Sequence, residues 1–293
     1  MPRPFRFGVN LLSSVNAEEW RAKCRRAEEL GYDVILVPDH LGMPAPFPAL
    51  VAAAEATERP RLGTFVLNAG FWNPALLARE VATTDALTGG RLELGLGTGY
   101  VPAEHETAGL PWGSPRERVD HLLRTIEELG RILGSDEHQP RPFQQPRVPL
   151  LVGANGDRML RITAEHADIA AFTGARTEEG GKLVPISAGE LDERVARYRG
   201  FANGRKESAE LNLLIQLVSV TEDPAAAVRP WLDRVPQTTE EEILDLPLVL
   251  VGPLNEIVEK ALAQRERYGF SYLTVLEPNM EAFAPVVEAL RGR

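Results

Sequence analysis

The stretch that decides the fold is RLGTFVLNAGFWNPALLAREVATTDALTGGRLELGLGTGY, residues 61–100. It contains an apolar run at 62–67, a helical pattern at 75–87 and a second apolar run at 92–96. Two short apolar runs joined by a helical pattern are typical of a β-α-β unit in a parallel sheet. The stretch therefore predicts a protein of the α/β class.

The same alternation extends toward both ends of the chain. Eight apolar runs rich in Val, Ile, Leu and Phe lie at 6–11, 34–38, 62–67, 92–96, 149–153, 169–172, 211–219 and 272–276. Helical patterns lie between them at 17–30, 75–87, 115–133, 158–167, 190–202 and 255–268. Eight strands, each followed by a helix, match a (β/α)₈ TIM barrel, which typically takes about 250 residues plus insertions. We expect residues 1–293 to form one such domain.

An open, doubly wound sheet is the alternative architecture, because strand runs alone do not show that a sheet closes. Its dinucleotide-binding form carries Gly-x-Gly-x-x-Gly after the first strand. Here the first run leads into Asn10-Leu11-Leu12-Ser13-Ser14, which lacks that turn. Three long connections, at 97–115, 173–189 and 221–247, follow the fourth, sixth and seventh runs. Because βα loops build the active site of a barrel, we expect functional insertions there.

The composition is that of an ordinary globular protein, with 44% hydrophobic and 25% charged residues. The formal net charge of −10 repels a phosphate backbone, so we expect no nucleic-acid partner. The single cysteine, Cys24, cannot form a disulfide within one chain, which fits a reducing cytoplasm. No apolar run approaches the roughly 18 to 20 residues that span a bilayer, so we expect neither a membrane anchor nor a signal peptide.

The second predicted strand ends in Val37-Pro38-Asp39-His40. Carboxyl ends of barrel strands face the active site, and an imidazole, which changes charge near neutral pH, can donate or accept a proton there. His40 is therefore a candidate catalytic residue. A histidine in a surface loop is the alternative explanation.

Two further polar residues follow predicted strands. Asn68 comes after the third strand, where its amide can bond the pyrimidine edge of a flavin or cap its own loop. Thr98 stands within Gly95-Leu96-Gly97-Thr98-Gly99, whose glycines permit close approach by a planar ligand. Asn73 and Pro74, by contrast, suit the cap and first position of the next helix.

The turn Gly153-Ala154-Asn155-Gly156-Asp157-Arg158 joins the fifth strand to a helix. Exposed backbone N–H groups at a helix start form an anion site that suits a phosphate. We expect Arg158, and Thr173-Gly174 after the next strand, to converge on it. An ordinary βα turn is the alternative, and Asp157 would compete with a bound anion.

Metal and covalent hydrolytic sites have no support in the sequence. The histidines at 105, 121, 138 and 166 show no ligand spacing such as His-x-x-x-His, so we expect no metal site. A Gly-x-Ser-x-Gly nucleophile motif is also missing from the sequence.

Taken together, these motifs resemble the luciferase-like monooxygenase superfamily, in particular its branch of oxidoreductases that use the deazaflavin coenzyme F-420. The densest match is the stretch 61–100, and weaker matches are Asp39-His40, the turn at 153–156 and Leu250-Val251-Gly252-Pro253 before the last helix. The resemblance implies a TIM barrel with a flavin or deazaflavin in its mouth.

The resemblance also implies where the cofactor binds. Its ring would lie against a bulge after the third strand, where relatives often have a non-proline cis peptide; the matching bond joins Phe65 to Val66. Asn68 and Thr98 would touch the ring or the ribityl chain. Asp39 and His40 fall where relatives keep a proton donor or a ring contact. The phosphate would be bound by Gly153, Asn155, Gly156, Thr173 and Gly174.

One position departs from the sugar-phosphate dehydrogenases of the family. They carry a glutamate after the Thr-Gly of the fourth strand, where this chain has Tyr100. A phenol is a poor general base at neutral pH but a usable acid or hydrogen-bond donor. Tyr100 is therefore a second candidate catalytic residue, and glucose 6-phosphate is not the expected substrate.

We expect hydride transfer between coenzyme F-420 (8-hydroxy-5-deazaflavin) and a small organic substrate. The alternatives are an FMN-dependent monooxygenase that uses oxygen and a barrel that binds a flavin or deazaflavin without turnover. The carbon that replaces nitrogen in the central ring of a deazaflavin favours hydride chemistry over oxygen chemistry, so the cofactor decides the reaction type. From the family we also expect a homodimer.

Overall fold

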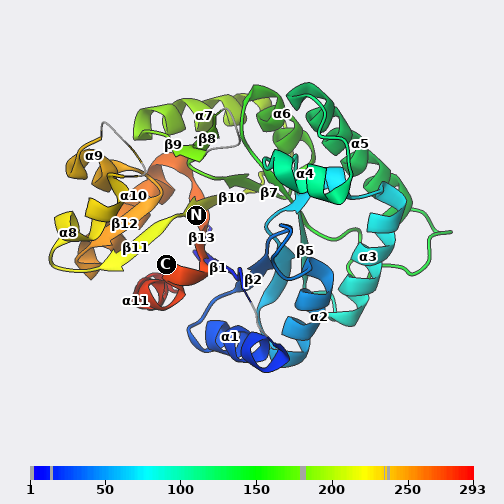
Figure 1. The fold of residues 1–293 in the computed structure, drawn as a ribbon, viewed down its shortest axis with the longest axis horizontal. Helices are drawn as coiled ribbons and strands as arrows, with labels where there is room; N and C mark the ends of the chain where they lie inside the picture. Colours follow the sequence, from blue (N-terminus) through cyan, green and yellow to red (C-terminus); the bar gives the residue numbers. More distant parts are fainter. Residues whose placement is uncertain (1–2, 14–15, 179–182, 234, 236–237) are drawn as a thin grey trace.

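The apolar runs form a closed parallel barrel surrounded by helices (Figure 1). The computed structural model describes residues 3–13, 16–178, 183–233, 235 and 238–293. In sheet order the barrel strands are β1 (Arg6–Asn10), β2 (Val34–Val37), β3 (Arg61–Thr64) with β4 (Leu67–Asn68), β5 (Leu92–Gly97), β6 (Leu150–Gly153), β7 (Ile169–Phe172), β10 (Glu210–Ile215) and β13 (Phe270–Leu276). The ring closes because β13 pairs with β1 and β3 pairs with β5. This confirms the (β/α)₈ barrel and excludes the open sheet.

All eight predicted runs contribute a barrel strand, because strands that are buried on both faces consist almost entirely of apolar residues. Two of the runs are not continuous strands, however. The third is interrupted between Thr64 and Leu67, so β3 and β4 share one place in the barrel. The seventh breaks at Gln216, after which β11 (Leu217–Val220) pairs with β12 (Val249–Gly252) in a separate small sheet.

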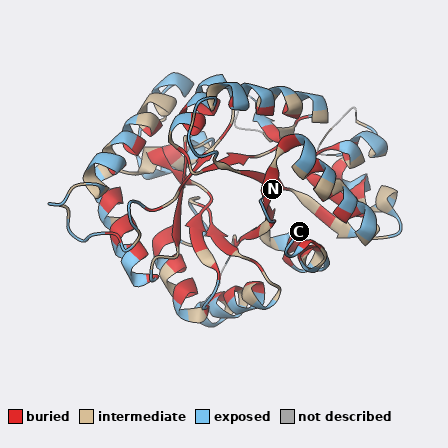
Figure 2. Ribbon diagram, turned by 180° about the vertical axis from the view of Figure 1, so that it is seen from behind, coloured by how far each residue is buried: buried red, intermediate tan, exposed pale blue. Residues whose placement is uncertain are grey.

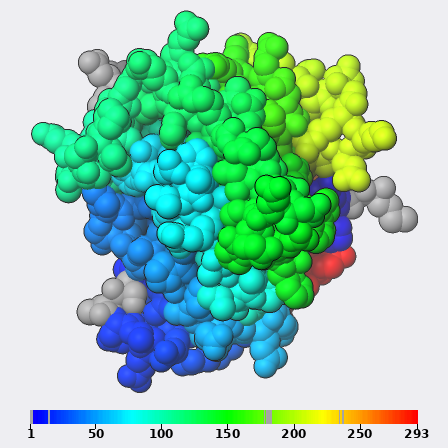
Figure 3. Space-filling model, turned by 90° about the vertical axis from the view of Figure 1, so that its right-hand side faces the viewer, coloured from blue at the N-terminus to red at the C-terminus, as the bar shows by residue number. Residues whose placement is uncertain are grey.

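Most of the helices bury their apolar faces against the barrel and expose their outer faces, whereas two short ones after β11 pack on the small sheet (Figure 2). They are α1 (Ala17–Glu29), α2 (Pro46–Ala56), α3 (Pro74–Leu87), α4 (Pro102–Ala108), α5 (Pro115–Leu133), α6 (Asp157–His166), α7 (Ala188–Phe201), α8 (Pro224–Val228), α9 (Glu240–Asp245), α10 (Leu254–Tyr268) and α11 (Met280–Leu290). As predicted, Asn73 caps α3 by accepting hydrogen bonds from the N–H groups of Ala75 and Leu76. Figure 3 shows one outer face, on which the cyan and green segments that include α3 and α5 lie next to one another.

The three long connections contain secondary structure of their own. The segment 97–115 holds α4, and 173–189 holds the antiparallel pair β8 (Ala175–Thr177) and β9 (Leu183–Pro185). The segment 221–247 holds α8 and α9. Residues 179–182, 234, 236 and 237 of these predicted insertions lie outside the described residues.

The amino-terminal end of the barrel is closed by ion pairs. Arg6 lies 2.6 Å from Glu93 and 3.0 Å from Glu210, and Arg61 lies 2.6 Å from the same Glu93. Glu93 is buried, and the ring of Tyr272 packs against the guanidinium of Arg6. A ligand therefore has to enter at the carboxyl ends of the strands.

Candidate active site

A cavity of about 920 Å³ lies at the carboxyl ends of the strands, and each of the eight barrel strands or the residues directly after it contributes to its wall. The predicted site residues that line it are Asp39, His40, Phe65, Val66, Asn68, Thr98, Tyr100, Gly153, Asn155, Gly156 and Thr173. The barrel therefore brings together residues that are more than 130 positions apart in the chain, as far as from Asp39 to Thr173.

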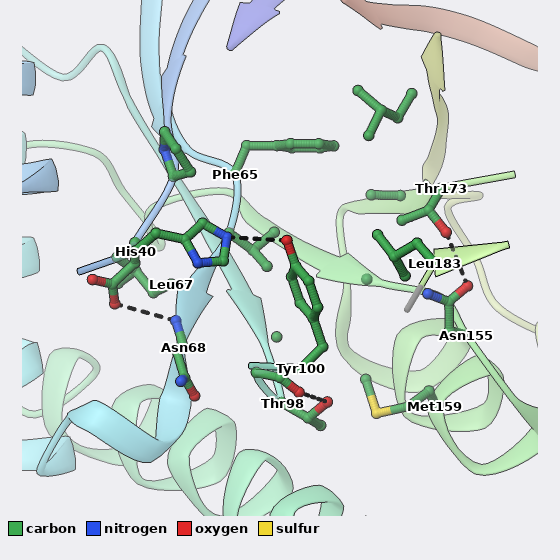
Figure 4. A pocket seen from close by; sticks show the side chains of 18 of the residues that line it. His40, Phe65, Leu67, Asn68, Thr98, Tyr100, Asn155, Met159, Thr173 and Leu183 are labelled. Carbon is green, nitrogen blue, oxygen red and sulfur yellow. Dashed lines mark hydrogen bonds between the residues drawn. The ribbon is translucent and has the colours of Figure 1, made fainter. Parts of the chain in front are cut away.

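His40 lies between a carboxylate and a phenol. Its Nδ1 is 2.8 Å from Oε1 of Glu104, and its Nε2 is 3.3 Å from the hydroxyl of Tyr100. The rings of His40 and Tyr100 meet edge to face, with centroids 5.4 Å apart (Figure 4). When the Nδ1–H of His40 donates a hydrogen bond to the Glu104 carboxylate, Nε2 is the ring nitrogen that can exchange a proton with the hydroxyl of Tyr100. We refer to His40, Tyr100 and Glu104 as the His40 cluster.

Tyr100 is the member of the His40 cluster with the most exposed side chain, since 39% of the residue is accessible. Partial burial, together with the negative charge of Glu104, raises the pKa of Tyr100 above its usual value. The phenol therefore stays protonated at neutral pH and acts as a donor.

Glu104 is not among the residues that the sequence predicts. It belongs to α4, inside the long connection 97–115, and it lies 64 positions from His40 in the chain. Its place in a long βα loop is the one available signal, because the contact with His40 is tertiary. Tyr100 stands where the sugar-phosphate dehydrogenases of the family carry a glutamate, but Glu104 still supplies a carboxylate to the site.

Asp39 is bonded within the protein. Its Oδ2 accepts hydrogen bonds from the backbone N–H of Asn68 at 3.2 Å and from Nε1 of Trp72 at 2.9 Å. Burial raises the pKa of the Asp39 carboxyl, although these two hydrogen bonds act in the opposite direction. Asp39 thus ties the loop that carries His40 to the segment after the third strand.

The third strand is interrupted by a cis peptide bond between Phe65 and Val66, which confirms the prediction from the resemblance. Thr64 bonds to the neighbouring strand at the interruption. Its Oγ1 donates to the carbonyl of Gly95 at 2.9 Å and accepts from the N–H of Gly95 at 2.8 Å. We call residues 64–68 the bulge.

The glycines of β5 and the following turn are required by the bulge. A Cβ at Gly95 would lie 2.0 Å from the carbonyl oxygen of Thr64, and one at Gly97 would lie 2.7 Å from Cγ2 of Val66. At Gly99, where φ is +71°, it would lie 2.6 Å from the amide of Asn68. The space that these glycines leave is thus filled by the backbone of Thr64 and the side chains of Val66 and Asn68, although Gly97 and Gly99 also line the cavity.

The side chain of Asn68 has partners on both sides within the protein. Its Oδ1 accepts from the N–H of Gly70 at 3.1 Å, so its Nδ2 is the group that faces Nε2 of His105 at 2.9 Å. Nδ1 of His105 lies 3.0 Å from the carbonyl of Pro111. Each bond fixes the direction of the next, so this network requires a neutral His105 with its proton on Nδ1. The structure thus shows the loop capping, and since Asn68 also lines the cavity, its contact with a flavin ring or ribityl chain stays a prediction.

The turn 153–156 and the start of α6 form another wall of the cavity (Figure 4). Gly156 precedes α6 with φ +76° and gives no side-chain cap, so the first N–H groups of the helix lack a capping acceptor. A Cβ at Gly153 or Gly156 would meet no atom within 4 Å, so both glycines border open space.

Two side chains support this turn. Nη1 of Arg194 donates to Oδ1 of Asn155 at 2.9 Å and to the carbonyl of Ala175 at 2.8 Å. The hydroxyl of Thr173 donates to the same Asn155 oxygen at 3.3 Å. Unsatisfied helix N–H groups beside an arginine are a suitable site for a phosphate.

Two expectations about this turn are corrected. Arg158 does not converge on it, because its guanidinium pairs with Asp120 of α5; Arg194, which the sequence does not single out, lines the cavity instead. Gly174 lies outside the cavity wall, and a Cβ there would lie 3.1 Å from the side chain of Leu248. Asp157 has a counter-ion, since Arg197 lies 2.8 Å away.

Within the described part of the chain, no group of three or more His, Cys, Asp or Glu residues is arranged to hold a metal ion. The helices among those residues include none that is long and apolar enough to cross a membrane.

Comparison with known proteins supports the resemblance. The family model for luciferase-like monooxygenases matches residues 3–236. An F-420-dependent glucose-6-phosphate dehydrogenase of Kribbella flavida is 39% identical over 294 aligned positions, which cover 90% of this chain and 83% of that protein. The oxygenase component of a flavin-dependent trigonelline monooxygenase of Acinetobacter baylyi is 32% identical over 203 positions, covering 63% of this chain and 52% of that protein.

A solved structure confirms the fold. An F-420-dependent secondary alcohol dehydrogenase superposes with a TM-score of 0.78 at 16% identity, covering 99% of this chain and 100% of that chain.

Proposed function

Because this chain belongs to the luciferase-like monooxygenase family, we propose that it is an oxidoreductase that moves a hydride between coenzyme F-420 and a small organic molecule. The observation that carries the proposal is the placement of the His40 cluster and the 153–156 turn on the wall of one cavity (Figure 4). The first can move protons and the second can bind a phosphate. The F-420-dependent relative at 39% identity supports the choice of coenzyme.

Two features of the cavity fit a flavin-type group. Oδ1 of Asn10 is buried with no hydrogen-bond partner among the described residues, and Asn10 lines the cavity, so a ring N–H can donate to it. Gly153 and Gly156 leave open space at the start of α6. In this proposal the bulge and Asn10 would hold the ring. Asn155, Thr173 and Arg194, with the α6 N–H groups, would hold the phosphate.

The bound coenzyme supplies two-electron hydride chemistry. The protein supplies the proton. The hydroxyl of Tyr100, which burial keeps protonated, donates to the substrate atom that gains negative charge. Protonated His40 then restores the Tyr100 proton from Nε2, and Glu104 stabilises the positive imidazole at Nδ1. In the reverse direction the same groups accept the proton.

The experiment that tests the proposal is a titration of the purified apoprotein with coenzyme F-420 and with FMN, followed by absorbance. We expect micromolar or tighter binding of F-420 and weaker binding of FMN. Stoichiometric binding of FMN without binding of the deazaflavin would contradict the proposal.

An FMN-dependent monooxygenase is the second candidate, supported by the flavin-dependent relative at 32% identity. The two candidates differ in their use of oxygen. Oxygen consumption that requires reduced FMN and a substrate would favour the monooxygenase, whereas turnover under anaerobic conditions with F-420 would favour hydride transfer.

A further inference from the structure

Arg118 is a cation in the cavity wall without an acidic partner among the described residues. Its guanidinium carbon lies 3.8 Å from the ring centroid of Trp112, which also lines the cavity. Its Nη1 donates to the carbonyl of Gly113 at 3.1 Å. Its Nε is buried and has no hydrogen-bond partner among those residues. Burial lowers the pKa of Arg118, and no neighbouring carboxylate opposes this effect.

The acidic residues beside Arg118 along α5 have other partners. Glu117 caps the helix, because its carboxylate accepts the N–H of Ser114 at 2.7 Å. Asp120 pairs with Arg158 of α6. The protein therefore does not neutralise the charge of Arg118 with its own side chains.

The other two arginines of the cavity wall are placed differently. Arg176 lies 3.3 Å from Glu178 and 3.5 Å from Glu190. Arg194 donates to Asn155 and Ala175 and has the charge of Glu190 nearby. A partly buried cation without a counter-ion costs free energy, which a bound anion offsets. Of the three arginines in the cavity wall, Arg118 is therefore the one whose charge a bound anion would stabilise most.

We propose that Arg118 and Trp112 form a subsite that binds the carboxylate of a ligand in the cavity. The indole face and the Gly113 carbonyl hold the guanidinium in one orientation. A guanidinium offers N–H donors in a fixed fork that matches the two oxygens of a carboxylate. Trp112 belongs to the connection 97–115 that also carries Tyr100 and Glu104, and Arg118 lies in α5 directly after it, so a carboxylate bound here lies on the same wall as the His40 cluster.

This inference rests on the proposed function, since it treats the cavity as the meeting place of a coenzyme and a substrate. The carboxylate has two sources: the organic substrate, or the glutamate-containing tail of coenzyme F-420. Both present the same chemistry to Arg118. Separate arms of one experiment distinguish them.

The experiment measures dissociation constants by calorimetry for wild type, Arg118→Gln and Arg118→Lys. Arg116→Gln is the matched control, because Arg116 lies on the same helical turn, is exposed and is outside the cavity wall. The first arm compares F-420 with a phosphorylated deazaflavin chromophore that lacks the tail. The second arm compares benzoate with benzamide on the F-420-loaded protein. Circular dichroism checks that each variant is folded.

We expect Arg118→Gln to weaken one carboxylate probe at least tenfold, Arg118→Lys to weaken it less, and Arg116→Gln to change nothing. A loss for F-420 but not for the tail-less chromophore assigns the subsite to the coenzyme tail. A loss for benzoate but not for benzamide assigns it to the substrate. Unchanged affinity for both carboxylates in folded Arg118→Gln overturns the subsite. Failure of wild type to bind F-420 contradicts the proposed function instead, so the two failures are distinguishable.

Discussion

Two walls of the cavity differ in how their polar groups are satisfied. In the wall formed after β2, β4 and β5, His40, Asp39 and Asn68 are hydrogen-bonded to other side chains or backbone of the protein. In the wall formed after β6 and β7, the start of α6 has no side-chain cap and two glycines border open space. Fixed internal bonds hold proton-transfer groups in place without reorganisation, whereas unsatisfied donors bind a ligand. Under the proposed function, the first wall would supply the proton-transfer groups and the second would bind the phosphate of the cofactor.

The largest expected effect tests the first wall. We expect His40→Ala to lower turnover about a hundredfold to ten-thousandfold, the range for a positioned proton-transfer group, with little change in cofactor affinity. Steady-state kinetics and a cofactor titration on the same preparation measure both. If lost affinity accounts for the whole defect, His40 is a cofactor contact and both walls serve binding.

Glu104→Gln should have the next largest effect. Glutamine keeps an oxygen that accepts from Nδ1 of His40 but removes the charge that stabilises a protonated imidazole. We expect about a tenfold to hundredfold loss of turnover, as for other carboxylates that orient a functional histidine, with cofactor affinity unchanged. Glu106→Gln, an exposed position on the same helix, is the control. Turnover equal to that of the Glu106→Gln control would show that Glu104 has no part in proton transfer.

Gly156→Val tests the second wall. Valine at φ +76° displaces the turn backbone and fills the open space before α6, so we expect the cofactor dissociation constant to rise severalfold or more. Turnover at saturating cofactor should change little. Gly204→Val is the matched control, because Gly204 has φ +92°, no atom within 4 Å of its Cβ and no place in the cavity wall. Equal affinities in both variants would place the phosphate elsewhere.

The same contrast explains how much of the site the sequence predicts. Residues of the second wall, Gly153 to Gly156 and Thr173, belong to short segments directly after predicted strands, so local pattern and fold class place them. Glu104, Arg194 and Arg118 come from helices, and their contacts with the cavity depend on tertiary packing. Sequence patterns carry no such information.

The fold is predicted better than the roles of individual residues. The eight apolar runs are enough to predict the barrel, because strands that are buried on both faces are apolar along their length and can be recognised from the local sequence. The interruption at Phe65–Val66 does not disturb that composition, so the run 62–67 reads as one strand. The glycines at 95, 97 and 99 resemble a ligand site in the sequence. Gly97 and Gly99 do line the cavity, but all three positions lack room for a Cβ because of residues in the bulge, which the local pattern does not show.

The smallest expected effect separates structure from chemistry within the first wall. Asp39 accepts hydrogen bonds from the backbone N–H of Asn68 and from Nε1 of Trp72, and burial raises the pKa of its carboxyl in the folded protein. A raised folded-state pKa means that this carboxyl contributes stability at low pH that is lost as pH rises through that pKa. Asp39→Asn keeps an acceptor oxygen for both bonds and carries no charge. We therefore expect the melting temperature of Asp39→Asn to exceed that of wild type by about 1–3 °C at pH 7 to 8. This difference should disappear as the pH falls toward about 4.

Asp136→Asn, which removes the same charge from a fully exposed side chain, corrects for the change in net charge. If Asp39→Asn is instead less stable at neutral pH, the negative charge beside His40 stabilises the wall, and Asp39 belongs with Glu104 in the chemistry of the site.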